Sequence, residues 1–194
     1  MEGRKKDREI ADEGLSSRTD DPEARARQVC LCLLTLAPRT RAQLAEALRK
    51  HDIPDEAAAK VLGRFEDVGL VDDAAFARTW VESRHYGRGL AGRALSAELK
   101  QRGVAPDDIR AAIDEQLSPD AEASAARLLV DRKLAATRGL SAEQRTRRLA
   151  GMLARKGYPA GLSFRVIREA MEAEGEEAAL EDESSLDYPE PDTE

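Results

Sequence analysis

Apolar side chains recur three and four positions apart along the middle of the chain, as in the pairs Leu44 and Leu48, Leu95 and Leu99, and Leu149 and Leu153. This spacing puts the paired side chains on one face of an α-helix. Proline and glycine interrupt the pattern at intervals and divide the chain into about nine helices of roughly 8–15 residues. Aromatic residues make up only 4% of the chain, whereas β-sheets favour aromatic and β-branched residues. The pattern therefore predicts an all-α fold.

The same apolar spacing occurs three times, which indicates an internal repeat. In each copy a second leucine follows the first after four residues, a large apolar residue after nine and another after eighteen. The three sets are Leu44, Leu48, Ile53 and Leu62; Leu95, Leu99, Val104 and Ile113; and Leu149, Leu153, Tyr158 and Ile167. A further helical segment precedes each leucine pair. We therefore predict three tandem three-helix repeats, over residues 25–72, 73–118 and 119–174.

Charge separates a basic body from acidic ends. Residues 25–171 carry 26 basic and 19 acidic side chains, whereas residues 172–194 carry eleven acids and no base. Residues 1–24 carry eight acids and five bases. Both ends lack a sustained apolar period, so we expect disordered charged termini over 1–24 and 175–194. A positive body favours an electrostatic interaction surface, for which the acidic end would compete, and a solvated body with solubilising tails is the alternative.

No catalytic, cofactor-binding or metal-binding residues are indicated. Gly87–Gly92 matches the spacing G-x-G-x-x-G, but the dinucleotide fingerprint requires a preceding strand and a helical segment precedes it here. Cys30 and Cys32 would point to nearly opposite sides of one helix, and no second cysteine pair is present to complete a structural zinc site. We therefore expect a protein that is not an enzyme and that needs no cofactor.

Two pairs of residues before this glycine segment are interpreted as structural. Asp72 and Asp73 follow a Gly-Leu-Val sequence and are expected to cap a helix that begins near Ala74. Phe76 and Trp80 lie four positions apart after the cap, a spacing that predicts core positions.

Basic residues are the main candidates for function. Several lie at spacings that put them on shared helix faces near the glycine segment and in the third repeat: Arg84, Arg88, Arg93, Lys100, Arg145, Arg148 and Arg155. Such a strip suits phosphates or an acidic protein surface. A solvated helix face is the alternative, and the aromatic residues are too sparse to predict a platform for stacking bases.

The segment Val68-Gly-Leu-Val-Asp-Asp-Ala-Ala-Phe-Ala-Arg-Thr-Trp80, followed by Arg84, resembles the RecX family of recombination regulators. A Gly-basic-Gly turn, a leucine pair and a Gly-Val pair follow in the family's order, at Gly87–Gly89, Leu95–Leu99 and Gly103–Val104. The resemblance covers about residues 25–172. His51-Asp52 stands in the first repeat where the family usually has glycine.

The resemblance implies an elongated, curved helical array that lies in the groove of the RecA–DNA filament and inhibits its ATPase, strand-exchange and coprotease activities. Its implied partners are the RecA filament and single- or double-stranded DNA within it, and the seven basic residues become candidate contacts. A plain helical DNA-binding protein that acts through phosphates, without a dedicated RecA interaction, is the competing hypothesis. The charged N-terminus without an apolar signal core and the short apolar runs predict a cytoplasmic protein that does not enter a membrane, and we expect a monomer.

Overall fold

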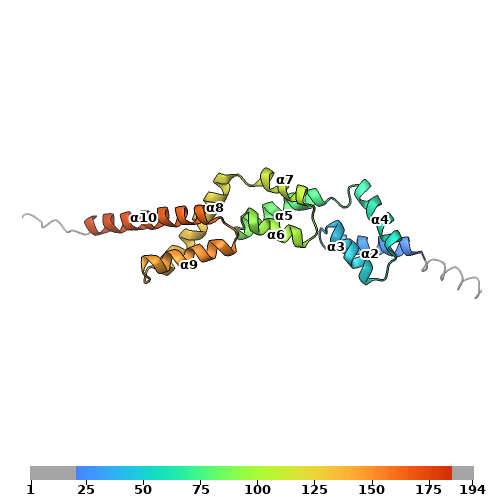
Figure 1. Ribbon diagram of the computed structural model, residues 1–194, viewed down its shortest axis with the longest axis horizontal. Coiled ribbons are helices and arrows are strands. Elements are labelled where there is room, and N and C mark those ends of the chain that lie inside the picture. Colours follow the sequence, from blue (N-terminus) through green and yellow to red (C-terminus); the bar gives the residue numbers. More distant parts are fainter. Residues whose placement is uncertain (1–20, 185–194) are drawn as a thin grey trace, which may run out of the picture. The chain divides into compact units, whose positions relative to one another are not determined.

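The computed structural model describes residues 21–184, with side chains to residue 175, and is helical along this range (Figure 1). Nine α-helices and one short 3₁₀ helix, Ala135–Thr137, occupy the described residues, and no strand occurs among them. The α-helices are α2 (Pro22–Leu36), α3 (Arg41–Lys50), α4 (Asp55–Asp67), α5 (Asp73–Arg88), α6 (Gly92–Gln101), α7 (Pro106–Gln116), α8 (Pro119–Leu134), α9 (Ala142–Arg155) and α10 (Ala160–Ser184). The predicted all-α class is confirmed.

The described residues form two compact units. The first contains the residues up to Trp80 together with Ala97–Ala112, and the second contains Val81–Ser96 together with the residues from Ile113 onward. The division passes through α5, α6 and α7, so these three helices contribute residues to both units. The repeat limits expected from the sequence stay a prediction.

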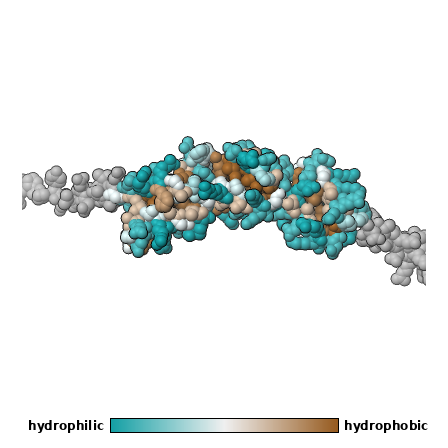
Figure 2. Space-filling model, in the orientation of Figure 1, coloured by the Kyte–Doolittle hydropathy of each residue, from teal (hydrophilic) through white to brown (hydrophobic). Residues whose placement is uncertain are grey.

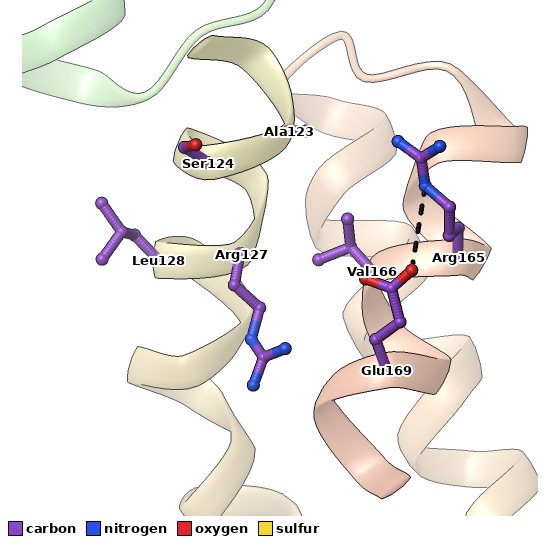
Figure 3. A pocket seen from close by; sticks show the side chains of 7 residues that line it. All are labelled: Ala123, Ser124, Arg127, Leu128, Arg165, Val166 and Glu169. Carbon is purple, nitrogen blue, oxygen red and sulfur yellow. Dashed lines mark ion pairs between the residues drawn. The ribbon is translucent and has the colours of Figure 1, made fainter. Parts of the chain in front are cut away.

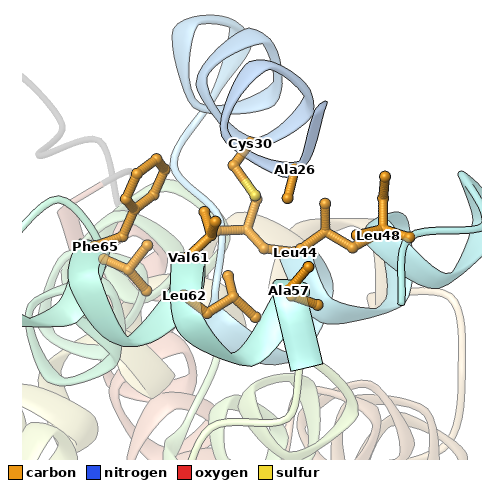
Figure 4. Packing of buried hydrophobic residues seen from close by; sticks show 11 residues of the cluster. Ala26, Cys30, Leu44, Leu48, Ala57, Val61, Leu62 and Phe65 are labelled. Atoms are coloured by element: carbon orange, nitrogen blue, oxygen red, sulfur yellow. The ribbon is translucent and has the colours of Figure 1, made fainter. Parts of the chain in front are cut away.

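The core of the first unit lies between α2, α3 and α4 (Figure 4). Ala26 and Cys30 on α2 face Leu44 and Leu48 on α3, and all four side chains are fully buried. Small side chains on α2 let its backbone approach the other two helices closely, which close packing of a helical core requires. Cys32, two positions after Cys30, is exposed as its helical position predicts.

In the second unit, α8, α9 and α10 pack against one another. Leu149 and Leu153 of α9 and Ile167 of α10 are almost completely buried there. Across the whole chain, eleven of the twelve repeat positions identified in the sequence are buried, and the remaining one, Ile113, is half-buried. The repeat pattern is therefore the pattern of the core.

Each leucine-pair helix ends in the same turn. The residue eight positions after the first leucine has a positive φ, which is 54° at Asp52, 79° at Gly103 and 89° at Gly157. The next amide N–H donates back to the carbonyl of the second leucine in all three copies, at 3.1 to 3.2 Å. This arrangement ends an α-helix with one left-handed residue and pairs a carbonyl that the helix leaves without a partner.

The carbonyl just before the left-handed residue is bonded by the preceding repeat. The Thr40 hydroxyl donates to the Arg102 carbonyl at 2.6 Å. The Ala91 amide donates to the Lys156 carbonyl at 2.9 Å. Thr40 and Ala91 occupy the same repeat position, four residues before the first leucine. The two junctions therefore use one hydrogen-bonding scheme.

A carboxylate completes each junction. Asp73 accepts a hydrogen bond from the Arg41 amide, the first residue of α3, at 2.8 Å. Glu122 accepts from the Gly92 amide, the first residue of α6, at the same distance. Acidic side chains stabilise helix N-termini because the first amides lack backbone acceptors. Each repeat thus caps the second helix of the repeat before it.

The two ends of the array lack these junctions. At the start, the equivalent carbonyl of His51 accepts from the Arg25 side chain at 3.3 Å. At the end, α9 begins seven residues before its first leucine, whereas α3 and α6 begin three residues before theirs. The position equivalent to Thr40 and Ala91 is Arg145, whose backbone lies inside α9. The Arg145 amide N–H, which would donate to a fourth repeat in this scheme, instead donates to the carbonyl of Ser141, the N-cap residue of α9.

The prediction that Phe76 and Trp80 occupy core positions was wrong. Apolar spacing does not guarantee burial elsewhere either, since Leu36 on α2 is 75% exposed, about a third of a turn away from the core face that Cys30 occupies. Phe76 and Trp80 are half-buried, and the buried positions of α5 include Ala77 and Val81.

Trp80 contacts polar neighbours instead of the core. Its ring stacks on Phe76 with centroids 5.7 Å apart, and the Arg102 guanidinium lies 3.7 Å from the Trp80 ring centroid. The indole N–H donates to Glu98 at 2.9 Å. The predicted cap at Asp72 is confirmed, since its carboxylate accepts from the Ala75 amide at 2.8 Å.

The helices at both ends reach beyond the limits expected for the folded body. α2 begins at Pro22 because Asp21 caps the Glu23 amide at 2.9 Å. α10 continues past Gly175 to Ser184 through residues rich in alanine and glutamate, which favour helix. The expectation of disorder over 1–20 and 185–194 lies outside the described residues.

The junction geometry predicts that glycine is required where a repeat meets the one before it. A Cβ at Gly157 would lie 2.5 Å from the Ala94 amide nitrogen, and the residue has a φ of 89°. Gly157→Ala should lower the free energy of unfolding by about 2–4 kcal/mol, measured by urea denaturation. Gly63→Ala, inside α4 with open space around it, should raise it by up to about 1 kcal/mol. Equal effects of the two substitutions would contradict the junction.

Candidate functional site

Hydrophilic residues cover much of the visible surface (Figure 2), and the candidate basic residues differ in their exposure and in their charge partners. Arg84 and Arg88 lie on α5, Arg93 and Lys100 on α6, and Arg145, Arg148 and Arg155 on α9. Lys100 belongs to the first unit and the other six belong to the second. Five are exposed, whereas Arg84 and Arg145 are half-buried.

Arg145, unlike the exposed members of the strip, is held in structural contacts. Its side chain is 14% exposed, and it forms an ion pair with Glu174 of α10. Its Nε also donates to the Thr137 hydroxyl at 3.1 Å. Arg138 approaches the other Glu174 oxygen at 2.6 Å. One carboxylate therefore ties α10 to α9 and to the residue that follows the 3₁₀ helix.

The two guanidinium groups lower the pKa of Glu174 below its usual range, with Arg138 as the larger cause and Arg145 as the next. The Glu174 and Arg145 side chains are only 13% and 14% exposed, so solvent screens their contact weakly, whereas the 69% exposed Arg138 is screened more strongly. Arg145, Arg138 and Glu174 thus form the bracket that holds α10 in place.

Arg93 and Arg155 come together in one pocket of about 580 Å³ between α6, α9 and the start of α10. Both side chains are exposed, and neither forms an ion pair in the described part of the chain. No acidic residue lines this pocket. Arg148 lies seven residues before Arg155, close to two helical turns, and is also exposed. Arg88 and Lys100 are likewise exposed and form no ion pair in the described residues, but of these available cations only Arg93 and Arg155 line the pocket.

Neighbouring pockets differ because their arginines are paired. One lies between α8 and α10, where Arg127 and Arg165 line the walls around Val166 (Figure 3). Arg165 is 4.0 Å from Glu169, the pair drawn in Figure 3, and Arg127 is 2.8 Å from Asp131. Arg168, which lines a pocket between α9 and α10, is 3.8 Å from Glu172. Positive charge without a carboxylate partner therefore distinguishes the Arg93–Arg155 pocket from these two.

Two functional features were not found from the sequence. Phe164, which lines the Arg93–Arg155 pocket, is 53% exposed although it lies in the apolar stretch that begins α10. Lys156 links the turn after α9 to the end of α5, since its Nζ donates to the Arg88 carbonyl at 2.5 Å. The spacing of Phe164 alone does not separate it from the core residues Val166 and Ile167, because the three are near neighbours in sequence.

The described residues carry no signature of other chemistry. His85 is buried with its Nδ1 2.9 Å from the Leu90 carbonyl, as a structural histidine would be. No group of three or more histidine, cysteine or carboxylate side chains is placed to hold a metal ion within residues 21–175. None of the helices described here combines the length and apolar character that crossing a bilayer requires.

Comparison with known families gives three matches in chain order. Residues 26–65 match the first three-helix domain of RecX, residues 72–113 the second and residues 120–167 the third. Together the matches cover most of the chain, and they correspond to the three repeats read from the leucine spacing.

Individual relatives agree with these matches. The regulatory protein RecX of Thermobifida fusca is 59% identical over 178 residues, covering 92% of this chain and 91% of that protein. The regulatory protein RecX of Streptomyces coelicolor is 60% identical over 157 residues, covering 81% and 83%. The crystal structure of RecX from Lactobacillus salivarius has the same fold, with a TM-score of 0.72 at 17% identity over 77% of this chain and 97% of that one.

The contacts of Glu174 with Arg138 and Arg145 make the free energy of unfolding depend on pH. Because the folded-state pKa of Glu174 lies below the ordinary 4.5, its ionised form stabilises the folded chain above pH 4.5. That contribution is lost as pH falls through the lower folded-state pKa. Glu174→Gln should lower the free energy of unfolding by about 1–3 kcal/mol at pH 7, and the gap from the natural protein should shrink in acid.

The matched control is Glu172→Gln, whose carboxylate is 64% exposed and 3.8 Å from Arg168. It should cost at most about 0.5 kcal/mol. Urea denaturation of both variants between pH 3 and 7 checks the prediction (the range brackets the ordinary glutamate pKa). A Glu174→Gln effect that does not change with pH would contradict the role of the ionised carboxylate.

Proposed function

The chain belongs to the RecX family of regulatory proteins, and from this premise we propose that it binds the filament that the RecA recombinase forms on DNA and lowers the filament's activity. The ATPase, strand-exchange and coprotease activities of RecA would all decrease, because each depends on filament rearrangement. As a member of a family of regulatory proteins, the chain is a regulator and not an enzyme.

The observation that carries the proposal is the group of exposed arginines in the second unit. Arg93, Arg148 and Arg155 have no carboxylate partner in the described part of the chain. Unpaired guanidinium groups suit phosphates and acidic side chains, both of which a protein–DNA filament can offer. Arg145 would act by holding α9 and α10 together, whereas Arg88 would add exposed charge to the second unit and Lys100 to the first.

Mechanistically, a regulator of this design acts by bridging. Its junctions are built from short hydrogen bonds and close backbone packing, as between the Thr40 hydroxyl and the Arg102 carbonyl. A chain of repeats joined in this way could contact successive filament subunits and resist their rearrangement. Blocking the entry of a second DNA duplex is a related mode that uses the same surface.

We also propose that the protein acts as a monomer. The two ends of the series of repeats do not complement each other. The His51 carbonyl of the first repeat already accepts from Arg25, and the Arg145 amide of the third repeat lies inside α9. Head-to-tail addition of a second copy through the junction scheme would require both groups. Sedimentation equilibrium should give the mass of one chain.

DNA binding without a dedicated RecA interaction is the second candidate function. It is favoured by the same unpaired arginines, which would bind phosphates on naked DNA. The two functions separate in a comparison of binding to naked DNA and to an assembled RecA filament across a range of salt concentrations. A preference for the filament that persists at high salt supports the RecA function, because phosphate contacts weaken as salt rises.

The decisive measurement is RecA-catalysed ATP hydrolysis on single-stranded DNA with this protein titrated in. The hydrolysis rate should fall with added protein. Arg148→Glu together with Arg155→Glu should weaken the inhibition at least about tenfold, because each lost contact removes a counterion-release contribution. The melting temperature should hardly change, since both side chains are exposed and unpaired.

Arg132→Glu together with Lys133→Glu is the matched control. Both residues are exposed on α8 of the same unit, and neither forms an ion pair in the described residues. Arg39 and Arg41 are poorer controls, because Arg41 pairs with Glu66 at 2.9 Å and the Arg39 Nε is buried. If both charge reversals weaken inhibition equally, the positive charge acts as a diffuse field and the α9 arginines are not contacts.

A further inference from the structure

The Arg93–Arg155 pocket has walls of three chemical kinds. The two guanidinium groups supply positive charge, and Phe164 supplies a large exposed aromatic ring. Most of the remaining lining is alanine and glycine: Ala94, Ala150, Gly151, Ala154, Gly157 and Ala160. Such small residues leave a space for a flat group beside the ring.

The polar groups of the lining are already engaged. The Tyr158 hydroxyl donates to the Gly89 carbonyl at 3.2 Å, and burial, with the charge of Glu122, raises its pKa to about 12. The Ser163 hydroxyl donates to the Pro159 carbonyl at 3.0 Å. An occupant therefore finds two cations and apolar surface in the lining, with few groups that could distinguish one base from another.

We propose that this pocket takes one unstacked base of single-stranded DNA. The base would lie against Phe164 and the alanine–glycine floor, while Arg93 and Arg155 hold its flanking phosphates. The volume of about 580 Å³ lies in the range of sites for molecules the size of a nucleotide. An aromatic ring beside arginines is the combination with which proteins hold single strands without sequence preference. The proposal rests on the proposed function, in that it assumes that the second unit meets DNA.

The chain's own acidic end is a poor occupant. Phe164 and Ser184 lie twenty residues apart on one continuous helix, which separates them by about 30 Å. Residues 185–194 span at most about 35 Å when fully extended. Only a nearly fully extended segment that runs straight back along α10 would span that distance, so the acidic end is the less favoured occupant.

The test compares two fluorescent oligonucleotides of equal length, oligothymidine and an abasic strand with the same phosphates. Binding of the full-length protein is followed by fluorescence anisotropy. Phe164→Ala should weaken binding to oligothymidine about tenfold, the change expected for one lost base–aromatic stack. Binding to the abasic strand should change less than about twofold. Phe164→Trp should restore the affinity for oligothymidine.

Two further variants control for folding and for loss of surface. Leu128→Ala removes an apolar side chain of similar exposure, 57% against 53% for Phe164, from the same unit, and should leave both affinities unchanged. Ala154→Leu adds bulk to the pocket at an exposed helical position. It should weaken oligothymidine binding as Phe164→Ala does, without touching the ring.

Other results would overturn the proposal in distinguishable ways. Equal losses on the two strands, or none on either, would show that no base enters the pocket. Loss of RecA inhibition by Phe164→Ala with unchanged oligothymidine binding would assign the pocket to a protein segment and leave the proposed function intact. A natural protein that binds neither strand also overturns the base site, and if it fails to inhibit RecA as well, the proposed function fails with it.

Discussion

The structure depends on the left-handed turn that ends the second helix of each repeat. Such a turn leaves a backbone carbonyl facing outward, and a buried carbonyl without a partner costs free energy. In the second and third repeats the preceding repeat provides the donor, from Thr40 or from Ala91. One backbone requirement thus sets both the ends of the helices and the order in which repeats join.

The same requirement explains why glycine occupies the turns of the second and third repeats but not the turn of the first. At Gly103 a side chain would collide with Ala42, and at Gly157 with Ala94, because another repeat packs directly on the turn. At the first turn the His51 carbonyl accepts from the Arg25 side chain instead of from a preceding repeat, and Asp52 takes the left-handed conformation there. The residue that departs from the family pattern therefore marks the start of the array.

Ending the array also shapes the candidate site. The extra helical turn at the start of α9 puts Arg145 where the earlier repeats have a junction donor, and Glu174 of α10 pairs with it. α10 is thereby fixed against α9, and its first turns close one side of the pocket that Arg93 and Arg155 line. Structural Arg145 and the candidate binding residues Arg148 and Arg155 lie on the same helix, and their burial and charge partners distinguish them.

The sequence by itself determined the helical class, the three repeats and the cap at Asp72, because these depend on residues close together in the chain. It also singled out the basic residues, since charge is readable without coordinates. Only the tertiary structure decided that Arg145 is engaged and that Phe164 is exposed. It also brought Arg93 and Arg155 together from positions 62 residues apart in the chain. Helical periodicity places a side chain on a face, but whether that face meets another helix, a carboxylate or solvent depends on packing between distant segments.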